Sequence, residues 1–186
     1  MEKTIFELGT IELGDYVYVT DPCYSPGIWC QALIKNVKSG KYHAFMNKVT
    51  IPNWGRVVSE LWVCHEGSAK DFPNTFVDGV EIGVDSGAAG IFDREYYEKH
   101  HQVNGELYEK WYDRQFNLRY EYDIDGNKME YDDDKIPLRE RRDGVAIDGK
   151  ACVSFSGYGD GSYELYVTTD DNGNVVSIGI KFLEIK

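Results

Sequence analysis

Three short segments combine acidic and small residues in patterns that could hold a ligand. Asp21 stands at the end of a strand-like segment, directly before a proline. Residues 84–93 place an acid on each side of a run of small residues, and residues 154–163 place three glycines around Asp160. Glycine at this density indicates positive φ or a close approach of the backbone to another group. Each segment is therefore either a tight turn or part of a binding site.

The four aspartates of these segments suggest metal chemistry as one option. Mg²⁺ and Ca²⁺ prefer several carboxylate and carbonyl oxygens, and a bound ion could activate water for hydrolysis. The alternative is that each carboxylate caps a turn or the start of a helix. We favour capping and expect no resident metal, and we keep a divalent cation as the alternative cofactor. The four residues are Asp21, Asp85, Asp93 and Asp160.

The two glycine-dense segments favour a pocket over a phosphate loop. Neither has a Walker pattern or the spacing of a dinucleotide fingerprint. Their backbone N–H groups could still hold a polar group, and nearby tyrosines could stack against a ring. We therefore expect the two segments to meet in the fold and to form a pocket with acids at its mouth. The predicted ligand-binding residues are Asp21, Tyr24, Asp85, Ser86, Gly87, Asp93, Tyr158, Gly159, Asp160, Gly161 and Tyr163.

The cysteines and histidines give no established catalytic motif. Cys23, Cys30, Cys64 and Cys152 are far apart and form no C-x-x-C arrangement. In a reducing compartment such residues are small core side chains more often than disulfides or zinc ligands. The spacing gives no support to a nucleophilic pair of cysteine and histidine. Whether the protein is an enzyme stays open at this point.

The composition indicates a soluble, acidic protein. Its 186 residues predict a single domain over residues 1–186. Lys and Arg number 20 against 32 Asp and Glu, and the net charge of −12 disfavours nucleic acid polymers and favours a basic protein partner. The sequence has no apolar run near the roughly 18 residues of a membrane span, and its N-terminus alternates polar and apolar residues. We therefore expect no membrane contact and a cytoplasmic location.

The elements that must position these segments are mainly strands. Runs of β-branched and aromatic residues, or alternation of polar and apolar residues, predict strands. These runs cover residues 1–8, 15–20, 28–37, 56–65 and 80–85. Residues 38–41 are predicted to turn the chain from 28–37 into 42–46 as a hairpin.

Three further hairpins are indicated by turn residues between strand-like runs. Their strands are 119–124 with 128–131, 144–147 with 151–155, and 163–168 with 175–182. Asp93 is a good N-cap and predicts helical structure after it. The predicted fold class is α+β and mainly β: an antiparallel sandwich-like or curved sheet with a helical insertion around 93–116.

The segments that carry the candidate residues resemble a known family. An Asp-Pro near the first strand, a Val-Asp-x-Gly…Asp block from Val84, and Gly-Asp-Gly-x-Tyr from Gly159 are its marks. The chain is similar to a family of bacterial and phage proteins known only as domain of unknown function 4241. Relatives are expected to have proline after that tyrosine, where this chain has Glu164, and the helical insertion is individual to this chain. The family has no established reaction, so the resemblance supports the fold grouping and the choice of segments.

Together these observations favour a protein that works by binding. The expected occupant of the glycine- and aspartate-rich loops is a small polar ligand, for example a signal nucleotide, or a basic protein partner. An acidic immunity protein that neutralises a basic toxin is one setting, since complementary charge speeds encounter. The alternative class is a metal-dependent hydrolase that uses the four aspartates.

Overall fold

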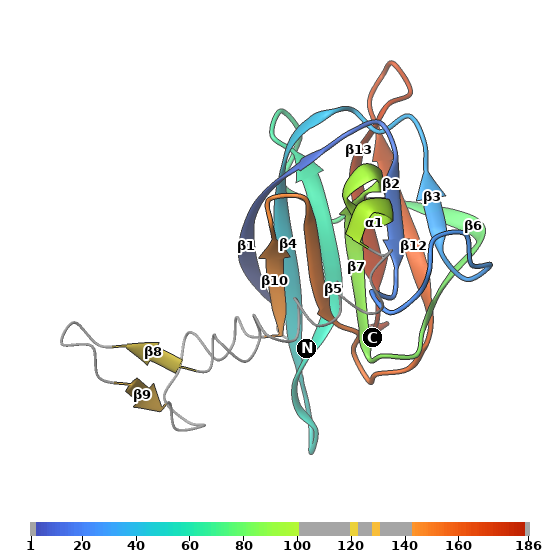
Figure 1. The fold of residues 1–186 in the computed structure, drawn as a ribbon. Helices are drawn as coiled ribbons and strands as arrows, with labels where there is room; N and C mark the ends of the chain where they lie inside the picture. Colours follow the sequence, from blue (N-terminus) through green and yellow to red (C-terminus); the bar gives the residue numbers. More distant parts are fainter. Residues whose placement is uncertain (1–2, 101–119, 123–127, 131–142, 185–186) are drawn as a thin grey trace.

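Two antiparallel β-sheets pack face to face in the computed structural model, which describes residues 3–100, 120–122, 128–130 and 143–184 (Figure 1). The six-stranded sheet has the order β1 (Lys3–Leu13), β4 (Gly40–Ile51), β5 (Gly55–His65), β13 (Val175–Lys181), β12 (Gly161–Thr169) and β6 (Thr75–Val84). The five-stranded sheet has the order β10 (Gly144–Ile147), β11 (Ala151–Phe155), β7 (Ala88–Asp93), β2 (Val17–Thr20) and β3 (Ala32–Ile34). The strands β8 (Tyr120–Tyr122) and β9 (Lys128–Glu130) form a separate pair. The predicted sandwich-like, mainly β class is confirmed.

The core lies between the two sheets because side chains alternate along each strand. Leu61 and Val63 of β5 belong to this core, together with Ile91 of the opposite sheet. The intervening Trp62 and Cys64 belong to a second cluster on the outer face of the six-stranded sheet. Burial of one such aliphatic side chain stabilises the fold by roughly 1.5–3 kcal/mol.

The helix α1 (Arg94–His100) covers the outer face of the five-stranded sheet. Tyr97 of α1 packs against Tyr18 and Phe92, with ring centroids 5.0 Å and 4.8 Å apart. The predicted cap is confirmed, since the Asp93 carboxylate accepts a hydrogen bond from the Tyr96 N–H at 3.2 Å. The rest of the predicted helical insertion, up to residue 116, lies outside the described residues.

Three of the predicted hairpins are confirmed by strand pairing. Asp148 and Gly149 have φ angles of 50° and 64°, and these left-handed conformations fit the central positions of the tight turn between β10 and β11, which the Lys150 N–H closes by donating to the Ile147 carbonyl at 3.0 Å. In the turn between β12 and β13, the Asp170 carboxylate accepts hydrogen bonds from the N–H groups of Asn172 at 3.0 Å and Asn174 at 2.9 Å. β8 and β9 pair antiparallel as well, and the turn between them lies outside the described residues.

The hairpin predicted over residues 28–46 is wrong, and its first strand is shorter than predicted. Of residues 28–37 only Ala32–Ile34 forms a strand, and it pairs with β2; residues 42–46 do form a strand, but as part of β4, which belongs to the other sheet. The reason lies in the loop before it: the Gln31 side chain accepts hydrogen bonds from the N–H groups of Gly27 and Ile28. Side-chain acceptors of this kind compete with a strand ladder for backbone donors.

The cysteines follow the prediction with one exception. Cys30, Cys64 and Cys152 are buried and all four cysteines are free, but Cys23 is exposed and is not a core residue. Burial raises the pKa of Cys152 to about 12, which keeps this thiol protonated and inert at neutral pH. Within the described residues, no helix is long and apolar enough to cross a membrane.

Candidate binding site at the loop end of the sandwich

The two glycine-dense segments meet in the fold, as the sequence predicts. Residues 85–87 connect β6 to β7, and residues 156–160 connect β11 to β12. β6 pairs with β12 and β7 pairs with β11, so both connections cross from one sheet to the other at the same end of the sandwich (Figure 1). The Ser156 N–H donates to the Gly87 carbonyl at 3.0 Å and joins the two loops directly.

Asp21 holds this corner together from inside. Its side chain is fully buried, and one carboxylate oxygen accepts the N–H groups of Asp85 and Ser86, both at 2.8 Å. The other oxygen accepts the Cys23 N–H at 2.7 Å and the Ser86 hydroxyl at 2.8 Å. Four hydrogen bonds use the acceptor capacity of a carboxylate. Asp21 is therefore a structural residue of the corner and has no lone pair left for a ligand or a metal ion.

Tyr24 is tied into the same corner. Its hydroxyl donates to the Asp85 carboxylate at 2.6 Å, and its carbonyl accepts a hydrogen bond from the Tyr97 hydroxyl. Burial first, and then the hydrogen bond to Asp85, raise the pKa of Tyr24, so this hydroxyl stays a donor. Asp85 itself is exposed at the surface.

Tyr163 lies beneath the second loop and does not offer a stacking surface to a ligand. Its hydroxyl proton is shared between the carbonyls of Ser156, at 2.8 Å, and Gly159, at 2.5 Å, and its ring packs edge-on against Phe182. Burial raises the pKa of Tyr163. Gly157 and Gly159, with φ angles of 59° and 108°, let the loop curl over this hydroxyl.

The remaining predicted site residues divide into two groups. Tyr158 and Asp160 are exposed on the second loop, and Gly161 begins β12 beside them. Asp93 lies elsewhere, because residues 88–93 form the strand β7 and not a loop. Its carboxylate accepts the Gly14 N–H at 2.9 Å and caps α1 at the far end of that strand. The convergence of four aspartates that the metal alternative needs therefore fails at Asp93, which caps the helix instead.

An aromatic pair that the sequence analysis missed stands at this end of the molecule. Trp54 lies at the tip of the β4–β5 hairpin, which extends past the end of the sandwich (Figure 1). Its side chain is 62% exposed and meets Tyr158, which is 54% exposed, edge to face at a centroid distance of 4.6 Å. The turn residues Asn53 and Gly55 could have indicated this exposure from the sequence, because a residue at a hairpin tip cannot enter the core. In the structure their φ angles are 67° and 84°.

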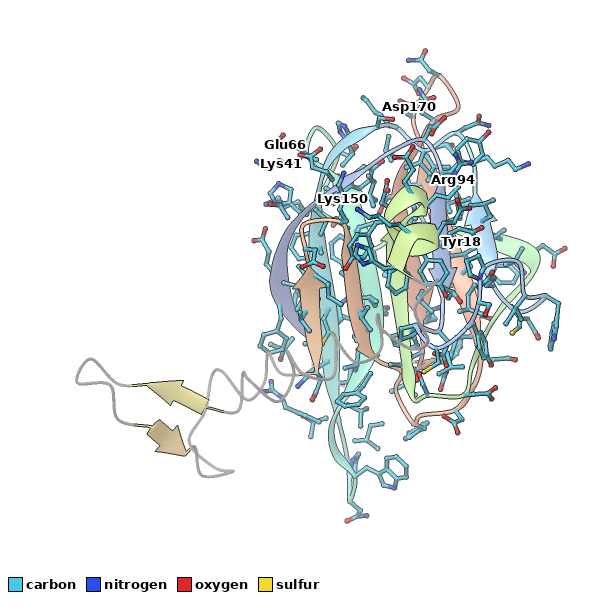
Figure 2. The ribbon with its side chains drawn as sticks, in the orientation of Figure 1. Tyr18, Lys41, Glu66, Arg94, Lys150 and Asp170 are labelled. Carbon is cyan, nitrogen blue, oxygen red and sulfur yellow. The ribbon has the colours of Figure 1, made fainter. Side chains whose placement is uncertain are left out.

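Two hollows among the described residues lie away from these loops. One of about 380 Å³ is on the outer face of the six-stranded sheet, and one of about 310 Å³ lies beside α1 near Arg94 and Lys150 (Figure 2). In the part of the chain that the structure describes, no group of three His, Cys, Asp or Glu side chains is arranged to hold a metal ion. The corner thus presents exposed aromatic rings and carboxylates on a hydrogen-bonded base.

Comparison with known proteins gives one match. The sequence model of a family described as a protein of unknown function (DUF4241) matches residues 78–180, which include both glycine-dense loops. Neither the curated proteins nor the solved structures contain a match to the chain.

Proposed function

The chain belongs to the DUF4241 family of proteins of unknown function, and we propose that it is a binding protein whose loop end captures a basic segment of a protein partner. The observation that carries this proposal is the exposed pair of Trp54 and Tyr158 on the braced corner. Tryptophan and tyrosine dominate the energetics of protein interfaces. They also attract arginine and lysine through their ring faces.

Charge supports a basic partner over other occupants. Asp85 and Asp160 are exposed on the two loops, and residues 21–31, 85–93 and 156–163 contain no Lys or Arg. The whole chain carries a net charge of −12. Such a field accelerates the approach of a cationic surface, and an immunity protein acting on a basic toxin is one setting in which this matters.

The other predicted occupants have less support from the same geometry. A small ligand was expected to use Tyr24 and Tyr163, but both hydroxyls are already bound within the protein. The alternative, a hydrolytic metal held by the four aspartates, would need Asp21 and Asp93, whose carboxylates serve the corner and the helix cap. A protein partner needs only the side chains that the corner leaves at its surface.

The test is selection of peptides from a displayed random library on the immobilised wild-type protein. We expect enrichment of sequences in which arginine or lysine flanks an apolar residue. A selected peptide should bind the Trp54→Ala/Tyr158→Ala variant about tenfold or more weakly, as expected for loss of interface hot spots. Its affinity should also fall with added salt.

The matched control is Phe76→Ala. Phe76 is 46% exposed but lies on the half of β6 remote from the loops, beside Tyr166. The proposal fails if the selected peptides are not basic, or if they bind the double variant as tightly as the wild type. Equal losses in the Phe76 variant would also contradict it, since they would point to general adhesion to aromatic side chains.

A further inference from the structure

The outer face of the six-stranded sheet carries a second polar cluster, remote from the loop end. The hollow of about 380 Å³ lies here, a size typical of small-molecule sites. Opposite charges and aromatic rings line it. The lining residues that matter for its chemistry are Lys3, Glu60, Phe72, Tyr166, Lys181 and Glu184.

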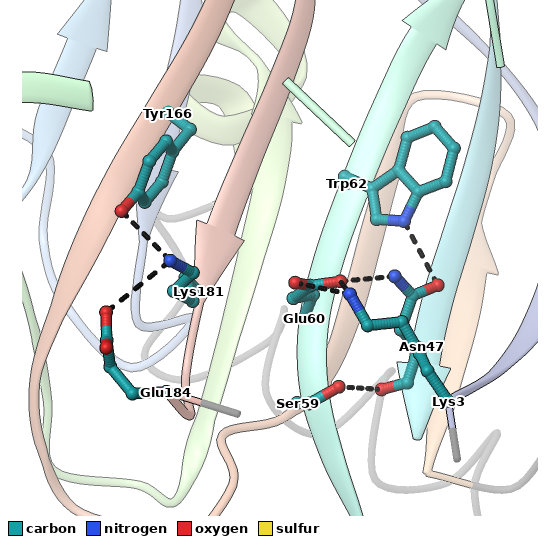
Figure 3. A network of polar contacts seen from close by, with 8 residues as sticks. All are labelled: Lys3, Asn47, Ser59, Glu60, Trp62, Tyr166, Lys181 and Glu184. Carbon is teal, nitrogen blue, oxygen red and sulfur yellow. Dashed lines mark hydrogen bonds and ion pairs between the residues drawn. The ribbon is translucent and has the colours of Figure 1, made fainter. Parts of the chain in front are cut away.

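Glu60 is a buried and pre-oriented carboxylate. Its side chain is only 5% exposed, and its oxygens accept hydrogen bonds from the Lys3 ammonium at 2.9 Å and 2.8 Å. The Asn47 amide also donates to it, and the Trp62 indole N–H donates to the Asn47 oxygen at 3.2 Å, which fixes the direction of the amide (Figure 3). An outward-facing position on a sheet does not require a buried charge, since apolar residues in place of a buried ion pair are often as stable.

Lys181 faces Glu60 across the sheet but does not bond to it. The two residues are direct partners in the register of β5 and β13, where cross-strand side chains are close neighbours. Lys181 instead lies 3.1 Å from the Tyr166 hydroxyl and 3.6 Å from the Glu184 carboxylate (Figure 3). An ammonium group has three N–H donors. Within the described residues, Lys3 uses two of these donors on Glu60, and Lys181 donates one to Tyr166 and forms only an ion pair with Glu184, so each lysine has at least one donor left for a ligand.

Lys181 remains charged in this setting. Burial lowers the pKa of Lys181, but the Tyr166 hydroxyl and the nearby carboxylates outweigh it, and the net pKa is raised. The lining residues named above carry two positive and two negative charges, and the Glu164 carboxylate, which accepts the Tyr166 hydroxyl at 2.7 Å, lies next to them. A ligand with one charge of each sign leaves that balance intact, whereas a simple anion or cation disturbs it. The rings of Phe72 and Tyr166, 5.4 Å apart, provide an apolar wall.

We propose that this hollow binds a small zwitterion with a ring, of the amino-acid type. Its carboxylate takes the spare N–H donors of Lys3 and Lys181, its ammonium meets the Glu184 carboxylate at the rim, and its ring packs on Phe72 and Tyr166. The site is separate from the loop end and does not depend on the function proposed there.

Three matched probes test the assignment by calorimetry: L-phenylalanine, 3-phenylpropionate, which lacks the ammonium, and 2-phenylethylamine, which lacks the carboxylate. We expect L-phenylalanine to bind and each of the other two to bind about tenfold or more weakly, because each lacks a charge-assisted hydrogen bond. The proposal is overturned if L-phenylalanine shows no binding up to about 10 mM, or if either analogue binds as well as L-phenylalanine.

Variants of the charged lining provide the second arm. Lys181→Met should weaken L-phenylalanine binding about tenfold or more. The control Lys41→Met removes a lysine from a comparable exposed ion pair, 3.9 Å from Glu66, and should leave binding unchanged. Glu184→Gln changes a side chain that is 70% exposed and cannot be required for folding, and it should also weaken binding. Undiminished binding in both lining variants refutes the site.

Discussion

Replacing Asp21 by asparagine should destabilise the whole fold, because the corner depends on this carboxylate. In the wild type it accepts four hydrogen bonds at 2.7–2.8 Å from Cys23, Asp85 and Ser86. The asparagine amide keeps one acceptor oxygen, and its NH₂ group, itself a donor, faces two of the donors that the second carboxylate oxygen had accepted. One or two charge-assisted bonds are lost, each worth about 1.5–3 kcal/mol. We therefore expect Asp21→Asn to lower the free energy of unfolding by about 3–5 kcal/mol.

Urea unfolding followed by circular dichroism measures this loss. For a chain of this size the same change lowers the melting temperature on the order of 10 °C. The control is Asp85→Asn: among the described residues this exposed carboxylate accepts a hydrogen bond from the Tyr24 hydroxyl alone, so the free energy of unfolding should fall by no more than about 1 kcal/mol. If the free energy of unfolding of Asp21→Asn is within about 1 kcal/mol of the wild-type value, the carboxylate does not stabilise the corner. A ligand-binding role for Asp21 then becomes the better explanation.

Three further predictions follow from other contacts. Gly179→Ala should lower the free energy of unfolding by about 1–3 kcal/mol in urea, because the new Cβ would lie 2.7 Å from the Phe72 ring. Hydrogen bonds, led by that from the Asn174 N–H, lower the pKa of Asp170 below 3.8, so the stabilisation that its carboxylate provides is lost as the pH falls through the folded pKa. Asp170→Asn should therefore lower the free energy of unfolding above pH 3.8 and progressively less below that pH. In native labelling with iodoacetamide followed by mass spectrometry, Cys23 should react first and Cys152 only after unfolding; rapid labelling of Cys152 would contradict its burial.

Local turn chemistry explains why much of the fold was predictable. The conformations of Asp148 and Gly149 follow from residue type, and the same holds for the Asp170 turn and the Asp93 cap. The strand predicted over residues 28–37 is wrong for most of its length because the Gln31 side chain overrides strand propensity there, through a contact that depends on the loop conformation.

The sites were less predictable because they depend on pairing between distant strands. The composition of the two glycine-dense loops predicted that they would meet, and they do. The role predicted for Tyr163 differs from the observed one: its ring was expected to stack on a ligand, but its hydroxyl bonds to the loop above it. The cluster of Lys3, Glu60 and Lys181 had no local sign at all. Only the register of β5 against β13 places Glu60 opposite Lys181.

The acids of the loop end have two different roles, and the distinction decides how the corner can act. Where two connections of the chain cross between the sheets side by side, their N–H groups leave the strand ladders. A buried donor without an acceptor costs about 1–3 kcal/mol. Asp21 supplies acceptors for three such backbone groups at once. The loops that carry Asp85 and Tyr158 are therefore held in place before any partner arrives, so binding orders few groups and loses little entropy. Recognition then falls to the exposed carboxylates and the Trp54–Tyr158 pair, whereas the buried aspartate makes that surface rigid.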